Sequence, residues 1–241
     1  MINTTEYKIG YLASFIVLKS MSDYDSYLTK ILNSEVLALL PKKYARKKLN
    51  VGETGIASIY DINGARLTLT QSSPQYVRRI LEYLLSDICI NQGILIKRSS
   101  IIIGRYIKVA IDTPPDNHIS TSYELYDMLR QYTEDIRFED YFGEKLSFVK
   151  YSNNIKEFVV NALCPPGNLE SIEVVTSFDS GKEIHVVIDN RYLGLFIGKK
   201  GLNIALASKL CYNVKIEIKG ISSEVIEQYR SRNQPGSNRT I

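Results

Sequence analysis

Two glycines three positions apart enclose two lysines in the stretch Gly198-Lys199-Lys200-Gly201. Glycine adopts positive φ angles and lets the main chain approach a ligand closely, because it has no Cβ atom. A helix expected to begin after Gly201 would present unpaired N–H groups and the positive end of its dipole at the same place. The two lysine side chains add positive charge there. These residue types in this order predict a site that binds phosphate groups.

Two other interpretations of the glycines are possible. A Walker loop requires Gly-x-x-x-x-Gly-Lys-Ser/Thr, whereas here Gly194 and Gly198 are separated by three residues and Lys200 stands in place of the hydroxyl. The Walker interpretation is therefore excluded. A plain connector between two helices, in which glycine serves only the backbone geometry, remains open from the motif alone.

The elements that must position this loop are predicted from hydrophobic periodicity. A helix is expected over 154–163, strands over 172–177 and 183–189, helices over 192–197 and 202–210 on either side of the loop, and a strand over 214–219. A glycine loop in this order of elements resembles the GXXG loop of a KH domain, which clamps about four single-stranded nucleotides.

The same order of elements is predicted once before, at a spacing of about 80 residues. Ser73 is a plausible N-cap with Pro74 in the first helical position, and an apolar stripe of period 3.6 follows from Val77 to Ile88. Strands are expected over 93–103 and 105–112, helix over 120–140 and a strand over 145–151. The pattern predicts an internal repeat of helix, strand, strand, helix, helix and strand.

The first seventy residues are instead rich in short strands. Four or five strands, expected within 7–18, 24–32, 35–40, 51–60 and 65–70, predict a small barrel or sandwich. Among them lies a basic run around one tyrosine, which contains Lys42, Lys43, Arg46, Lys47 and Lys48. This run is either a solvated loop or a patch that contacts phosphates.

The composition is typical of a soluble globular protein, since 44% of the 241 residues are hydrophobic and 23% are charged. A formal net charge of +4 permits a polyanionic partner without requiring one. No apolar run approaches the ~20 residues of a membrane span, and the N-terminus lacks a signal-peptide pattern. Three cysteines and two histidines, all widely spaced, indicate neither a disulfide framework nor a metal site. We expect a cytoplasmic protein with no metal, no cofactor and no membrane partner.

The stretch 193–210, followed by 214–218, resembles the second KH domain of the bacterial transcription factor NusA family. Three further stretches agree with this family in order, namely 67–79, 104–111, and 143–149 together with 157–166. The resemblance covers about residues 35–219. It implies an α+β multi-domain protein with an S1-like OB-type β-barrel at 1–72, a first type-II KH domain at 73–152 and a second at 153–230. A polar tail at 231–241 is expected to be disordered.

The sequence departs from the family pattern in three places. Family members usually carry an N-terminal domain that docks on RNA polymerase, whereas this chain begins at the barrel; we expect that anchor to be absent or supplied by another protein. The first GXXG position falls on Met128-Leu129-Arg130-Gln131, which contains no glycine, so we expect a degenerate, weakly binding or structural copy. Leu202 and Ala205 stand where the family usually has glutamine and arginine.

The leading hypothesis is a non-enzymatic RNA-binding factor that acts on nascent single-stranded RNA in pausing, termination or antitermination. RNA polymerase or a transcription complex would be its partner, directly or through another factor. Base preference would come from Ile197 and Ile188. The candidate RNA-binding residues are Gly198, Lys199, Lys200, Gly201, Asn203, Ile197, Arg191, Arg130, Lys108, Lys42, Lys43, Arg46, Lys47 and Lys48.

Two alternatives remain open. The protein could bind RNA in ribosome assembly or RNA metabolism, or it could be a degenerate protein-interaction scaffold whose RNA affinity has been lost. Catalysis is the least expected function, because the cysteines lie in apolar runs and His185 lies within a predicted strand.

Overall fold

A computed structural model describes residues 7–64, 66–115, 118–119, 121–163, 176–179, 183–222 and 224–225. The chain divides into two compact units, Met1–Val109 with Gln131–Ser147 and Ala110–Arg130 with Phe148–Ile241. The three predicted domains and their bounds stay a prediction, and the tail at 231–241 lies outside the described residues.

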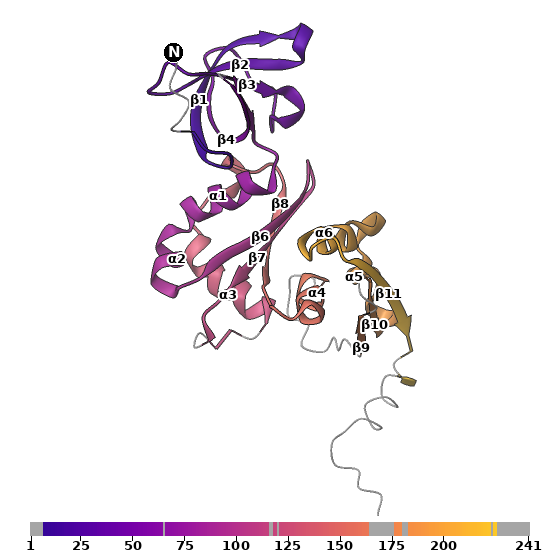
Figure 1. The fold of residues 1–241 in the computed structure, drawn as a ribbon. Coiled ribbons are helices and arrows are strands. Elements are labelled where there is room, and N and C mark those ends of the chain that lie inside the picture. The colour runs from indigo at the N-terminus through magenta and orange to yellow at the C-terminus, as the bar shows by residue number, and fades with distance from the viewer. Residues whose placement is uncertain are drawn as a thin grey trace, which may run out of the picture. The chain divides into compact units, whose positions relative to one another are not determined.

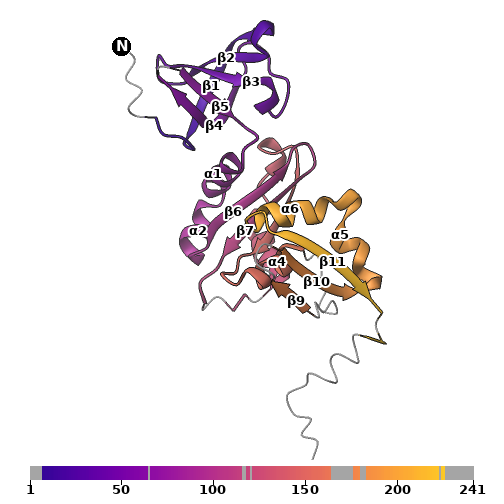
Figure 2. The ribbon, with the colours of Figure 1, turned by 45° about the vertical axis from the view of Figure 1, so that its right-hand side comes forward.

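The N-terminal part of the first unit is a closed five-stranded barrel in the order β1-β2-β3-β5-β4 (Figures 1 and 2). Its strands are β1 Leu12–Met21, β2 Ser26–Ile31, β3 Leu37–Pro41, β4 Thr54–Asn63 and β5 Arg66–Thr70. Phe15, Leu40, Leu67 and Leu69 fill the interior and are completely buried. A Cβ atom at Gly55 would lie 2.8 Å from the Phe15 ring, so a glycine makes room for this large side chain. Of the two expected architectures, barrel and sandwich, the structure has the barrel.

The helix that follows the barrel begins where its sequence predicts. In α1, Pro74–Leu84, the Ser73 hydroxyl accepts a hydrogen bond from the Tyr76 main-chain N–H, and the buried face includes Val77 and Ile80. The apolar stripe does not form one helix, because the main chain breaks at Leu85 before α2, Ser86–Gln92.

Three strands then form a sheet in the order β6-β7-β8, with β6 Leu95–Ile102, β7 Tyr106–Asp112 and β8 Lys145–Lys150. Helix α3 spans only Ser122–Thr133 of the predicted 120–140, and a 3-10 turn, η5, lies at Phe138–Asp140.

The second unit contains a further three-stranded sheet, in the order β11-β10-β9 (Figure 2). Its strands are β9 Thr176–Asp179, β10 Glu183–Asp189 and β11 Lys215–Ile221; β10 pairs parallel with β11 and antiparallel with β9. After Phe148 this unit contains the helices α4 Ile155–Leu163, α5 Leu193–Ile197 and α6 Leu202–Leu210, with 3-10 turns η6 Asn190–Tyr192 and η7 Lys199–Gly201. The strand predicted at 172–177 is described only from Thr176.

Apolar and polar side chains alternate along β10, and this pattern determines which face of the sheet the helices cover. Ile184, Val186 and Ile188 are buried in one core with Phe158 of α4 and Phe196 of α5, whereas Glu183, His185 and Val187 are only partly buried. A strand places successive side chains on opposite faces, so the helices pack on one face and the polar residues lie on the other.

Among the described residues, no helix is both long and apolar enough to cross a membrane.

Candidate nucleic-acid interface

The predicted phosphate-binding loop lies between α5 and α6. Gly198, directly after α5, has φ 74° and ψ 166°, a region that only glycine adopts readily. Gly201 has φ 71° and ψ 14°, in the left-handed region, and α6 begins at the next residue. The main-chain geometry therefore requires glycine at position 198 and favours it at position 201.

The two glycines differ in the space that is available for a Cβ atom. A Cβ atom at Gly198 would lie 2.7 Å from Cβ of Asn203 and 3.0 Å from its main-chain nitrogen. A Cβ atom at Gly201 would meet nothing within 4 Å. The loop thus folds back onto the first turn of α6 at Gly198 and is open at Gly201.

The two lysines between the glycines are both exposed. Lys200 also adopts a left-handed conformation, with φ 55° and ψ 33°, which is uncommon for a residue with a side chain. The loop therefore presents two ammonium groups on a strained main chain at the start of a nine-residue helix. This arrangement can neutralise phosphates while the glycines let a nucleic-acid backbone come close.

The other predicted residues near the loop occupy different environments. Ile197 is half-buried at the end of α5, whereas Ile188 is completely buried and cannot line an open cleft. The Arg191 guanidinium is exposed and donates hydrogen bonds to Asp189 at 2.8 and 3.0 Å, which raises the pKa of Arg191. The Asn203 amide nitrogen donates to two main-chain carbonyls instead of pointing outward.

At the corresponding place of the earlier repeat there is no loop. Met128 to Gln131 lie within α3, which runs on to Thr133, and Leu129 is completely buried. A helix continues here because no glycine interrupts it. Arg130 is exposed on this helix.

The predicted basic run of the first unit is divided between surface and interior. Lys43 and Lys48 are exposed, and the Lys43 ammonium lies 5.0 Å from the centroid of the Tyr44 ring. Lys42 lies 3.6 Å from Asp25, and Lys47 forms an ion pair with Glu53 at 2.6 Å.

Arg46 has a structural environment that its place in a basic run did not reveal. Its guanidinium lies over the rings of Phe142 and Tyr76, at 5.3 and 5.9 Å, and forms a buried ion pair with Glu144. Burial lowers the pKa of Arg46. Lys108, in β7, is also buried, with 5% of its surface exposed. Neither side chain is presented to a phosphate backbone.

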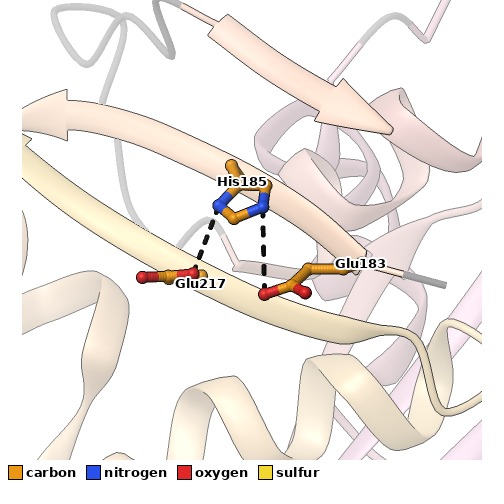
Figure 3. Close-up of side chains that lie close together, drawn as sticks. All are labelled: Glu183, His185 and Glu217. Carbon is orange, nitrogen blue, oxygen red and sulfur yellow. Dashed lines mark ion pairs between the residues drawn. The ribbon is translucent and has the colours of Figure 1, made fainter. Parts of the chain in front are cut away.

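The face of the β11-β10-β9 sheet that the helices leave uncovered carries a network of charged residues that the sequence did not predict (Figure 3). His185 Nδ1 lies 3.2 Å from a Glu217 oxygen, and Nε2 lies 3.8 Å from a Glu183 oxygen. Lys215 donates to Glu183 at 2.5 Å and lowers the pKa of that carboxyl. One ligand atom from each of Glu183, His185 and Glu217 lies within 4.8 Å of the other two, close enough for the group to hold a metal ion, although the sequence predicts no metal site. The parallel register of β10 and β11, which pairs His185 with Glu217, brings them together.

The loop and the sheet beside it resemble those of a KH-type domain. Residues 155–225 match the family model described as "NusA-like second KH domain", and this range contains the whole glycine loop. Parts of the chain resemble NusA proteins.

Curated relatives support that resemblance over different lengths of the chain. The "Transcription termination/antitermination protein NusA" of Borreliella burgdorferi is 29% identical over 180 residues, which cover 71% of this chain and 36% of the relative. The proteins of that name from Rickettsia prowazekii and Bacillus subtilis are 37% and 39% identical over 75 and 77 residues. Those matches cover 31% and 32% of this chain, and 15% and 19% of the relatives. The chain thus spans little more than a third, or less, of the length of these relatives.

Proposed function

We propose that this protein is an RNA-binding transcription factor of the NusA type, which contacts nascent single-stranded RNA and modulates pausing, termination and antitermination. The observation that carries the proposal is the exposed Lys199–Lys200 pair, held between two positive-φ glycines inside the segment that matches a NusA-like second KH domain. The names of the relatives support the transcriptional role.

In this proposal the loop acts as a clamp for the RNA backbone. The absence of Cβ atoms at Gly198 and Gly201 lets phosphates approach the main chain, while Lys199 and Lys200 neutralise their charge. Such contacts position the RNA without reading its sequence. They favour single strands, whose bases are free to turn away from the clamp.

Further contacts would extend the path of the RNA. We include the exposed Arg191, Arg130, Lys43 and Lys48, with Lys42 and Lys47 after exchange of their carboxylate partners. Ile197 would contact a base, and the barrel would serve as an S1-type module beside the first KH-like segment. The buried Arg46 and Lys108 are left out of this path. A transcription complex in the cytoplasm would be the partner, bound directly or through another factor.

A titration of fluorescent single-stranded RNA with the full chain at several salt concentrations tests the clamp. The double variant Lys199→Asp, Lys200→Asp is compared with Lys209→Asp, Lys219→Asp, which makes the same change in charge at exposed positions of the same unit. Loss of two phosphate contacts should reduce the slope of log affinity against log salt by about 1.4. The control variant should keep the wild-type slope.

Equal affinity of the two double variants would refute the clamp and favour the scaffold interpretation. If the clamp is confirmed, a reconstituted transcription assay decides the role. The wild type should alter pausing and termination, and the loop variant should not. RNA binding without any effect on transcription would favour ribosome assembly or RNA metabolism.

A further inference from the structure

We propose that Asn203 is a positioning residue for the glycine loop: its side-chain amide ties the C-terminal ends of two helices to the first turn of α6 and thereby holds the loop in its RNA-binding geometry. The inference rests on the proposed function of the loop. It replaces the expectation that Asn203 contacts RNA itself.

The Asn203 side-chain amide forms two hydrogen bonds to the ends of other helices. Asn203 Nδ2 donates to the carbonyl oxygen of Leu163 at 2.8 Å and to that of Phe196 at 2.7 Å. Leu163 is the last residue of α4, and Phe196 is the penultimate residue of α5. Carbonyls in the last turn of a helix have no partner within that helix. The Asn203 side chain therefore provides a hydrogen-bond donor to one terminal carbonyl group of each of the two helices.

Asparagine is the residue type that matches these two acceptors. An amide nitrogen has two N–H donors, and here two carbonyl acceptors receive them. Aspartate has the same shape but no donor, and alanine has neither donor nor reach. Because both acceptors are carbonyl oxygens, asparagine is suited to this position as a donor, and its role does not depend on an RNA group.

Asn203 also lies in contact with the glycine loop. The place of a Cβ atom at Gly198 is only 2.7 Å from Asn203 Cβ, so loop and asparagine are in direct contact. Gly198, Lys200 and Gly201 all have positive φ angles. Such conformations persist only where the surroundings hold them. The two hydrogen bonds of Asn203 anchor the loop at its α5 end and are a source of that restraint.

The experiment measures loop order in the free protein and RNA affinity in the same variants. Asn203→Ala removes the donors, and Asn203→Asp removes them while keeping the shape. Ser208→Ala is the matched control, because the Ser208 hydroxyl on the same helix donates to the Val214 carbonyl at 2.7 Å, away from the loop. Hydrogen exchange of the amides of residues 198–202 measures how ordered the loop is. Exchange of the amides of β10 shows whether the second unit remains folded.

For both Asn203 variants we expect exchange in the loop to be about tenfold faster and RNA affinity about tenfold lower, since two hydrogen bonds are lost. Ser208→Ala should change both by less than twofold. If Asn203→Ala also raises exchange throughout β10, Asn203→Ser, which keeps one donor, takes its place.

Each remaining outcome overturns the inference. Lower affinity with unchanged loop exchange would mean that Asn203 contacts RNA directly. Faster loop exchange with unchanged affinity would mean that the order of the loop is irrelevant to RNA. Failure of the proposed function is recognised separately, because Lys199→Asp, Lys200→Asp would then leave RNA affinity unchanged, whatever Asn203 does to exchange.

Discussion

Replacing each loop glycine by alanine should have very different consequences, although both glycines have positive φ. At Gly198 the new methyl group would lie 2.7 Å from Asn203 Cβ and 3.0 Å from the Asn203 main-chain nitrogen. The main chain of α6 cannot move aside without disturbing the helix. At Gly201 the methyl group would enter open space.

The expected losses of stability follow from backbone strain at each position and from steric overlap of the new methyl group with its neighbours. Alanine at Gly198 would occupy a glycine-only region, at a cost of about 1–3 kcal/mol, and the overlap adds about 1–3 kcal/mol. Alanine at Gly201 would only have to adopt the left-handed backbone conformation, which costs about 1–2 kcal/mol. We therefore expect Gly198→Ala to destabilise the second unit by about 4 kcal/mol, and Gly201→Ala by about 1.5 kcal/mol.

Native-state hydrogen exchange on the full chain measures this difference within the second unit. The slowest amides of α6 and β11 give the free energy of opening for wild type and both variants. Gly201→Asn is a useful control, because asparagine tolerates the left-handed region better than alanine. Opening free energies of Gly198→Ala and Gly201→Ala within about 1 kcal/mol of one another would refute the close packing of the loop on α6.

Three further predictions concern buried and paired charges. Glu144→Gln should destabilise the first unit by about 3–5 kcal/mol in urea unfolding, because it leaves the buried Arg46 guanidinium without its counter-charge; a loss well below 1 kcal/mol would contradict the buried pair. Burial raises the pKa of Tyr76 to about 12, so the folded state binds its proton more tightly than the unfolded state, and stability present below pH 10 should fall by about 2 kcal/mol as the pH rises to 12, where the side chain is half ionised in the folded state. Tyr76→Phe should lack this part of the alkaline loss. Lys215 lowers the pKa of Glu183, so the stability that ionised Glu183 contributes is present above its unfolded pKa and is lost as the pH falls through its folded pKa. Glu183→Gln should therefore make the loss of stability at acid pH less steep. An unchanged acid-pH dependence would argue against the pair of Lys215 and Glu183.

Local signals in the sequence were sufficient for much of the fold and for the position of the glycine loop. Capping by Ser73 and the period of the apolar stripe located the start of α1. The spacing of Gly198 and Gly201, with helical patterns on both sides, located the loop between α5 and α6. Such features depend on residues a few positions apart, and their energetics act before any tertiary contact forms.

Other properties were decided only when distant segments came together. Barrel and sandwich share the same strands, and the pairings of β1 with β4 and of β3 with β5 close the barrel. A basic run does not reveal that Arg46 meets Glu144, almost a hundred positions away in the chain. Asn203 could be taken as an RNA contact until the carbonyl of Leu163, forty positions earlier, was found to accept its amide. Residue types and short-range periodicity determined which elements form and where a phosphate could bind. Which charged and polar groups face solvent depends on long-range packing, because burial is a property of neighbours that the local sequence does not contain.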